Sequence, residues 1–302
     1  MDQAEKLRKA IEDLKAKQLR NRRTLPAIPA KRTARVITVT SGKGGVGKTN
    51  ISVNLAIALS GQGLRVVILD ADFGLANIDV LLGIVPQHTL LDVIKDRKNI
   101  IEILNEGPQN IKFISGGSGV EELLRLNREQ VARFIKNISL LDRLADIIIV
   151  DTGAGLSDNV MSFIMAADEI LLVTTPEPTS ITDAYALIKM ISNRDNAKKI
   201  KILVNRAESS AEANDVLNKL VLVADRFLGL KLEPAGYVLN DDAVKKAVKQ
   251  QQPFIVAYPK STAARNIKEI SVKLAQNENS GEQHQEHGIR SFFSRLAGFV
   301  RT

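Results

Sequence analysis

Short apolar runs alternate with helix-like patterns along most of the chain. The runs have the length and aliphatic character of buried strands, and they occupy residues 36–40, 66–69, 111–114, 147–150, 170–174, 202–204 and 236–239. Between them, apolar residues recur at the spacing of helices, as in residues 50–59. Strands buried on both faces and separated by helices are typical of a parallel sheet that is covered on two sides. The pattern predicts an α/β fold, with a doubly wound, mostly parallel sheet in a domain of residues 34–275.

The first 33 residues form a separate, basic arm. Within residues 4–20, helical spacing relates four apolar residues, Ala4, Leu7, Ile11 and Leu14, while charged residues occupy most other positions. We expect a short amphipathic helix there, followed by a linker that contains Pro26 and Pro29.

A second amphipathic stripe ends the chain, in residues 288–302, after a polar linker of residues 276–287 that we expect to be disordered. Its apolar face consists of Ile289, Phe292, Phe293, Leu296, Phe299 and Val300, and its flanks carry Arg290, Arg295 and Arg301. A helix of this length spans about 22 Å, too little to cross a bilayer. We interpret the segment as a membrane-targeting helix that lies in the plane of an anionic membrane surface. Packing of the same stripe on the protein's own body is the alternative.

Composition narrows the class of protein. The chain has 302 residues, no cysteine and a net charge of +8, so disulfides and thiolate-held zinc or iron–sulfur clusters are excluded. Residues 1–35 hold eleven Lys or Arg against four Asp or Glu, a net charge of +7, which leaves the body near neutral. This distribution favours basic docking segments over a DNA-binding body. Because no stretch resembles a signal peptide or a membrane span, we expect a cytoplasmic protein that associates peripherally with the membrane.

A glycine-rich octapeptide lies between the first predicted strand and the helix that starts near Asn50. It consists of Gly42, Lys43, Gly44, Gly45, Val46, Gly47, Lys48 and Thr49. This is the spacing of a phosphate-binding loop, in which main-chain N–H groups surround a di- or triphosphate, Lys48 contacts the outer phosphates and Thr49 coordinates Mg²⁺. The positive end of the helix dipole adds to the attraction. Lys43 is an additional lysine, either a solvated surface charge or a second phosphate ligand.

Aspartates follow two of the other predicted strands. Asp70 and Asp72 come after residues 66–69, and Asp151 comes after residues 147–150. Ligands of open α/β sheets bind at the carboxyl ends of the strands, so these carboxylates are placed to hold Mg²⁺ directly or through water. Helix caps or turn formers are the alternative, since aspartate also serves those roles.

With these motifs, residues 34–275 resemble the MinD/ParA family of dimerising ATPases, whose deviant phosphate loop reads Lys-Gly-Gly-x-Gly-Lys-Thr, as here from Lys43. The resemblance implies that ATP and Mg²⁺ bind between two subunits and that Lys43 reaches the partner's phosphates. It implies further that Asp72 orients the attacking water while Asp70 and Asp151 assist with Mg²⁺. Asp183 matches the position that holds the signature lysine in the monomer and helps to form a partner surface. Residues resembling the family's adenine site are Asn205, Arg206, Leu239, Asn240 and Asp241; proline is frequent in the family where Leu239 stands.

The resemblance implies phosphoryl transfer by positioning and charge neutralisation, in which Lys43, Lys48 and Asp72 are the catalytic groups. Since one lysine comes from the second subunit, hydrolysis is slow and tied to formation of the homodimer.

The beginning of the arm resembles the activator segment of the FlhG (YlxH) group, MinD-like ATPases that control flagellar number and placement. In that group the segment stimulates GTP hydrolysis by the signal-recognition-type GTPase FlhF, which makes Gln3, Leu7 and Arg8 the expected partner residues; flagellar basal-body components are further partners to consider. A basic helix that docks on the protein's own body is the alternative for the arm. For the whole chain, the alternatives are a general MinD-like regulator of the division site, a ParA-like DNA-segregation ATPase and a metallocluster enzyme on the same fold.

Overall fold

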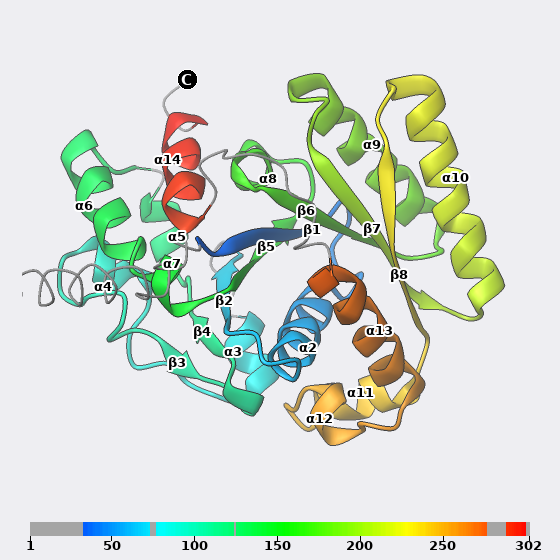
Figure 1. The fold of residues 1–302 in the computed structure, drawn as a ribbon, viewed down its shortest axis with the longest axis horizontal. Helices are drawn as coiled ribbons and strands as arrows, with labels where there is room; N and C mark the ends of the chain where they lie inside the picture. The colour runs from blue at the N-terminus through cyan, green and yellow to red at the C-terminus, as the bar shows by residue number, and fades with distance from the viewer. Residues whose placement is uncertain (1–32, 73–76, 124, 277–287, 300–302) are drawn as a thin grey trace, which may run out of the picture. The chain divides into compact units, whose positions relative to one another are not determined.

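One eight-stranded sheet runs through the part of the chain that the structure, a computed structural model, describes: residues 33–72, 77–123, 125–276 and 288–299 (Figure 1). The strands are β1 (Arg35–Ser41), β2 (Val66–Ala71), β3 (Asn105–Glu106), β4 (Lys112–Ile114), β5 (Ile147–Ala154), β6 (Glu169–Thr174), β7 (Lys199–Ala207) and β8 (Leu232–Leu239). Their order is β3-β4-β2-β5-β1-β6-β7-β8, and all neighbours are parallel except β3 and β4. The predicted doubly wound sheet is confirmed, and each of the apolar runs lies in a strand except Ile111, which directly precedes β4.

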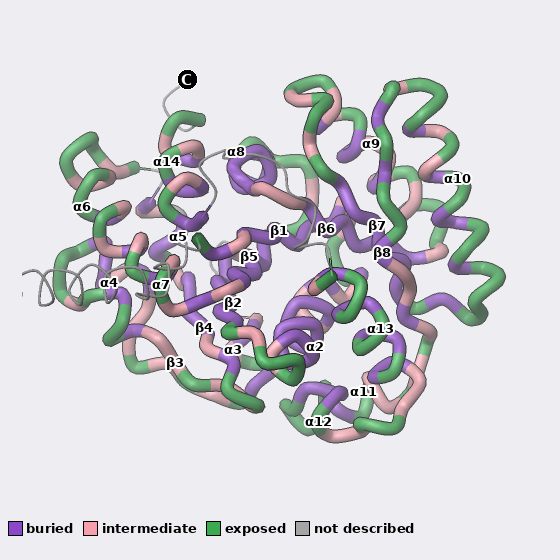
Figure 2. The backbone as a smooth tube through the Cα atoms, viewed as in Figure 1, coloured by how far each residue is buried: buried purple, intermediate pink, exposed green. Residues whose placement is uncertain are grey.

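Helices cover both faces of the sheet, as Figure 2 shows by the buried stretches that face it. One face is covered by α2 (Lys48–Ser60), α3 (Asn77–Leu82), α11 (Asp242–Lys249), α12 (Phe254–Ala257) and α13 (Thr262–Gln276). The other is covered by α4 (Leu90–Ile94), α5 (Gly119–Leu123), α6 (Arg128–Ile138), α7 (Leu141–Leu144), α8 (Asp158–Ala166), α9 (Pro178–Arg194), α10 (Ser210–Leu228) and α14 (Ile289–Phe299). A single 3₁₀ turn, η1 (Pro108–Asn110), precedes β4. Because β1 lies near the centre of the strand order, the loop that follows it, which begins at Gly42, lies near the middle of the sheet's carboxyl edge.

The last helix, α14, packs on the protein and does not present its apolar face to solvent. Ile289, Phe292, Phe293 and Leu296 are at most 2% exposed and belong to the same core as α6 and α8. The apolar stripe thus fills a groove of the body in this structure, which is the alternative named for it from the sequence, and lipid binding by the same stripe stays a prediction. Of the remaining predicted membrane residues, Phe299 and Arg290 are exposed, and Val300 and Arg301 lie outside the described residues. Among the described residues, no helix is long and apolar enough to cross a membrane.

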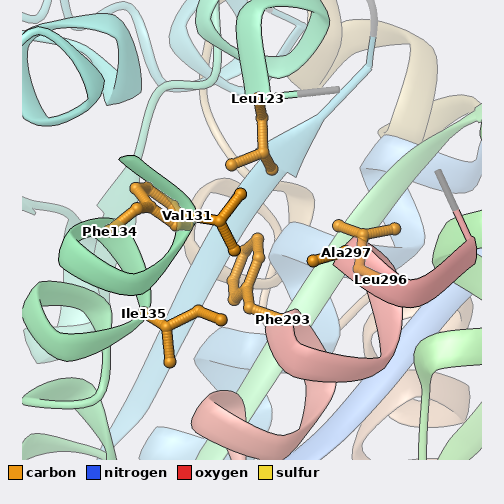
Figure 3. A pocket seen from close by; sticks show the side chains of 7 residues that line it. All are labelled: Leu123, Val131, Phe134, Ile135, Phe293, Leu296 and Ala297. Carbon is orange, nitrogen blue, oxygen red and sulfur yellow. The ribbon is translucent and has the colours of Figure 1, made fainter. Parts of the chain in front are cut away.

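Aromatic rings hold α14 against its neighbours. The ring of Phe293 lies edge-on to Phe134 of α6, with ring centres 5.1 Å apart, and Phe292 contacts Phe163 of α8 at 6.1 Å. Figure 3 shows how side chains of α6 and α14 enclose the remaining gap, whose volume of about 10 Å³ is room for one water at most. The gap leaves no room for a ligand between α14 and α6.

Polar contacts hold both ends of α14. The carboxylate of Asp142 accepts hydrogen bonds from the main-chain N–H groups of Ile289 and Arg290, which begin the helix. At the other end, Arg295 donates to the carbonyl of Ala166 and to the carboxylate of Asp168. Cations at the last carbonyls of a helix are favoured by its dipole, so Arg295 links α14 to the C-terminal end of α8.

An ion-pair row crosses four strands near their starts. Glu169 on β6 pairs with Arg35 on β1 and, at 2.6 Å, with Lys201 on β7, which also lies 3.5 Å from Glu233 on β8. Burial alone would raise the pKa of Glu169, but the hydrogen bonds and charges of Arg35 and Lys201 lower it below its usual value. Since a lowered folded-state pKa favours the ionised, folded protein, this carboxylate stabilises the fold above its unfolded pKa, and that stability is lost as the pH falls.

We predict that Glu169→Gln destabilises the protein by about 3 kcal/mol at pH 7, because it leaves two largely buried cations without their common partner. Chemical denaturation between pH 3 and pH 7 measures the effect. The difference in unfolding free energy between variant and wild type should shrink as the pH falls below the pKa of an ordinary glutamate. Glu233→Gln is the matched control, since Glu233 faces the same lysine but is 57% exposed, and it should cost less than about 1 kcal/mol. A Glu169→Gln effect as small as that of Glu233→Gln would contradict the interpretation.

Candidate functional site

The predicted phosphate loop joins β1 to α2 at the carboxyl edge of the sheet. Gly45 and Gly47 have φ angles of 78° and 94°, the left-handed region that glycine adopts without strain. Helix α2 starts within the last two residues of the loop, at Lys48, and no acidic residue lies in its first turn. Its free N–H groups and positive dipole end therefore face the space that the loop encloses, which is the arrangement of an anion site.

Lys48 and Asp151 meet beneath the loop. The Lys48 ammonium group lies 3.2 Å from Asp151 Oδ1, and Ser52, one turn along α2, donates its hydroxyl to the same oxygen at 2.9 Å. Asp151 is fully buried, yet its second oxygen, Oδ2, has no hydrogen-bond partner among the described residues. A buried carboxylate oxygen without a donor is a strong acceptor for a cation or for a cation's water, so the donor set fits Mg²⁺.

Asp70 lies beside Asp151. The two residues are register partners on neighbouring parallel strands, β2 and β5, and both are fully buried. Burial and then the charge of Asp151 raise the pKa of Asp70 to about 8. Its oxygens accept hydrogen bonds from the main-chain N–H groups of Asp72 and Ile78. Two adjacent carboxylates in a dry position repel each other, and a divalent cation would relieve the repulsion.

The protein provides only part of a metal cage. Within the described residues, no group of three or more His, Cys, Asp or Glu side chains gathers to hold a metal ion. Asp70, Asp151 and the Thr49 hydroxyl stay the predicted oxygen ligands at the loop. Mg²⁺ usually keeps several waters and takes its remaining ligands from substrate phosphates, so such a partial set suits a nucleotide-bound Mg²⁺.

Asp72, the predicted water-orienting residue, lies close to the end of β5. Its carboxylate accepts a hydrogen bond from Asn77 at 2.8 Å. A Cβ on Gly153 would lie 3.0 Å from Asp72 Oδ1, so the missing side chain at Gly153 leaves room for this carboxylate. The segment after β2 thus meets the end of β5. Residues 73–76 of that segment lie outside the described residues.

The side chain of Lys43 contacts residues other than Asp183, the residue that the family resemblance gave as holding this lysine in the monomer. Its ammonium group donates to Glu177 and to the Thr179 hydroxyl, both at 2.9 Å, at the start of α9. Asp183 lies one turn further along, where its main chain packs against Gly42: a Cβ on Gly42 would be 2.4 Å from the Asp183 carbonyl. Asp183 therefore supports the loop through its backbone, while Glu177 and Thr179 hold the lysine. Glu177 and Thr179 belong to the stretch after β6, but no signal in the sequence indicated that these two residues would contact Lys43.

The residues assigned to the adenine end are partly engaged elsewhere. The side chain of Asp241 caps α11 through Ala243 N–H and also accepts from Ala263 N–H. Asn240 donates to Glu208 at 2.8 Å, and the N–H of Leu239 donates to a side chain of α13. Arg206 is exposed, and Asn205 is buried against the phosphate loop. The predicted partner residues of the arm, Gln3, Leu7 and Arg8, lie outside the described residues.

Comparisons with known proteins point to the same kind of site. A family profile described as "ParA: NUBPL iron-transfer P-loop NTPase" matches residues 32–275. The chain is 45% identical to the antiactivator FleN of Pseudomonas aeruginosa, over 79% of this chain and 85% of FleN. It is 34% identical to the flagellum site-determining protein YlxH of Helicobacter pylori, over 89% of this chain and 92% of YlxH.

Solved structures show the same fold. The MinC:MinD cell division complex of Aquifex aeolicus contains a chain with a TM-score of 0.66 and 25% identity, covering 84% of this chain and 100% of that one. The septum site-determining protein MinD of Pyrococcus horikoshii, solved with Mg-ADP, also has a TM-score of 0.66, at 22% identity, and covers 83% and 100% of the two chains.

We predict that Asp151→Asn removes most of the Mg²⁺ dependence of nucleotide binding. The substitution keeps the size of the side chain and an acceptor for Lys48 and Ser52, but replaces the unpartnered oxygen by an NH₂ group that cannot ligate a cation. Titration calorimetry with and without EDTA measures how much Mg²⁺ raises the affinity for ATP. This gain in affinity should be at least about tenfold larger for wild type than for the variant. Asp158→Asn, on the exposed start of α8, is the control and should behave as wild type. An equal Mg²⁺ effect in Asp151→Asn and wild type would exclude the site.

Proposed function

Because the chain belongs to the MinD/ParA family of P-loop ATPases, we propose that it is a membrane-cycling ATPase switch that controls the number and placement of flagella. As a member of this family it is an ATP hydrolase that uses Mg²⁺. The flagellar role rests on similarity to FleN and YlxH, whose names describe an antiactivator and a flagellum site-determining protein. A general MinD-like role at the division site is the second candidate, since the chain is also 28% identical to MinD of Bacillus subtilis.

The position of Lys43 carries the proposal of a dimerisation switch. Lys43 is the second residue of the loop, and its side chain is 38% exposed and pairs with Glu177 of another segment, which is 60% exposed. An exposed ion pair of this kind contributes little stability, so Lys43 exchanges it readily for a better-placed phosphate. In the ATP state, Lys43 would leave α9 and reach the nucleotide of a second copy. Each site would then contain two lysines and Mg²⁺, which offset the charge that develops on the transferred phosphoryl group, while Asp72 aligns the water.

Membrane binding would depend on release of α14. Each of the four buried apolar side chains of α14 contributes about 2 kcal/mol when it is removed from water. Undocking in water would therefore be costly, whereas an anionic membrane offers the same side chains a second apolar environment. The docked helix corresponds to the detached state of the protein. Two α14 helices held in one ATP-bound dimer would gain in effective concentration at the membrane.

Helix α8 would connect the two events. It follows the end of β5, where Asp151 and Gly153 lie, and it carries Phe163 and Ala166, the contacts of Phe292 and Arg295. A shift of the β5 end around Mg²⁺ and the γ-phosphate would move α8 and loosen the groove of α14. The ATP-bound dimer would thus reside at the cytoplasmic face of the membrane.

The basic arm would serve a separate partner. Its first residues, including Gln3, Leu7 and Arg8, match the activator segment of the FlhG group, so we assign to them stimulation of an FlhF-type GTPase. Two other candidates are disfavoured. The near-neutral body argues against a DNA-segregation ATPase, and a chain without cysteine has no thiolates to carry an iron–sulfur cluster.

The switch predicts that liposomes containing anionic lipid sediment more protein with ATP than with ADP or without nucleotide. Lys43→Ala should lose this ATP-dependent increase and ATP-dependent dimerisation together, and its ATP hydrolysis should fall at least about tenfold, by loss of a charge at the phosphates. Sedimentation, size-exclusion chromatography and phosphate release measure these quantities. A chain ending at residue 287 is the control that lacks α14 and should dimerise but not sediment. Equal sedimentation of wild type in all nucleotide states, or normal dimerisation and hydrolysis by Lys43→Ala, would refute the switch.

For the arm, we predict that the full chain accelerates GTP hydrolysis by an FlhF-type GTPase and that Arg8→Ala abolishes most of the acceleration. Lys17→Ala, which removes the same charge from the same arm outside the motif, should leave it intact. Acceleration that is lost equally in both variants would indicate a general charge effect. No acceleration by wild type would leave a MinD-like ATPase without this partner.

A further inference from the structure

The end of β7 is fastened to the phosphate loop by one side chain. Asn205 Nδ2 donates a hydrogen bond to the main-chain carbonyl of Val46 at 2.8 Å, and Asn205 is only 7% exposed. The next loop residue, Gly47, is packed against the same amide, since a Cβ there would lie 2.5 Å from Asn205 Nδ2. The buried amide therefore touches two consecutive residues of the loop that surrounds the phosphates.

The backbone of β7 is irregular at this point. Its pairing with β8 shifts register between Asn205 and Ala207, so that Arg206 is the additional residue of a β-bulge. Arg206 has a φ angle of 60°, the left-handed region that residues other than glycine seldom adopt. Such bulges re-aim neighbouring side chains, and strained backbone of this kind is retained where the surrounding structure requires it. Here both residues that flank Arg206 are buried, and Asn205 faces the loop.

Peptide geometry gives the contact a consequence for phosphate binding. In a planar trans peptide, the C=O of one residue and the N–H of the next point in opposite directions. Holding the Val46 carbonyl toward Asn205 therefore turns the N–H of Gly47 away from Asn205. A peptide flipped the other way would present a carbonyl oxygen to an anion and withdraw one of the donors that bind it.

We propose that Asn205 is a positioning residue for the phosphates, which acts through the Val46–Gly47 peptide of the loop independently of any contact with a base. The family resemblance assigned Asn205 to adenine, a role that would act on the opposite end of the nucleotide. The role proposed here requires no nucleotide to be present, because the loop is held in its binding conformation beforehand. Preorganised donors bind and stabilise charge without reorganisation during the reaction.

Hydrogen exchange of the nucleotide-free protein tests this role directly. In Asn205→Asp, which keeps the volume of the side chain but removes the NH₂ donor, main-chain amides of residues 42–49 should exchange at least about fivefold faster than in wild type. The affinity for MgATP should fall about tenfold, equivalent to about 1.4 kcal/mol. Asn205→Ala should give the same direction of change in both measurements, and the melting temperature without nucleotide reports that each variant is folded.

Asn240→Ala is the matched control, since Asn240 also lies at a strand end near the proposed base site but donates to Glu208. Its loop amides should exchange as in wild type. Loss of ATP affinity in the Asn205 variants with unchanged loop exchange would make Asn205 a base contact and overturn the proposal. Faster loop exchange with unchanged ATP affinity would overturn it as well, since the contact would then have no effect on phosphates.

Discussion

The candidate site depends on two carboxyl groups, those of Asp70 and Asp151, that are buried side by side. Asp70 and Asp151 are neighbours because parallel strands β2 and β5 end together, and their burial makes the ionised pair unfavourable until positive charge arrives. Lys48 and Ser52 satisfy one oxygen of Asp151, and the other oxygen is left to a cation. The site is therefore incomplete by construction. Mg²⁺ that arrives with the nucleotide would supply the missing positive charge, and each movement proposed for Lys43, α8 and α14 draws on that change.

The arrangement of the sheet connects this small electrostatic event to a distant surface. Strand β5 carries Asp151 at its carboxyl end, and the chain then passes directly into α8, which forms one wall of the groove that holds α14. A rigid helix between a charged site and a packed helix is a physical path along which displacement can travel. In the proposed switch, docking of α14 and binding of nucleotide would therefore act on opposite ends of one element.

Strong local patterns made the sheet and the loop predictable, whereas contacts between residues far apart in the sequence could not be predicted. The aliphatic runs located every strand except β3, which has only two residues, and the glycine spacing located the loop. The partners of Lys43 and the loop contact of Asn205 depend on which strand ends meet in space, so spacing along the chain did not show them. Ser52 was within reach of sequence reasoning, since it lies one turn after Lys48 on the same helix. For α14 the amphipathic pattern was correct, but a pattern does not distinguish a lipid surface from a protein groove.

A helix that could pack either on the protein or on lipid is constrained in its evolution, and Arg295 illustrates the constraint. Its guanidinium group holds the last carbonyls of α8 in the docked form, and the same group is suited to lipid phosphates once α14 is released. If α14 binds lipid as proposed, replacing Arg295 by a neutral residue would loosen docking and weaken membrane attachment together, so neither property could be adjusted alone at this position. Phe299 of the same helix is 42% exposed, so packing constrains it less than the buried side chains of α14. Natural variation along α14 should therefore be uneven, with Arg295 held by docking and, in the proposed switch, by lipid binding as well.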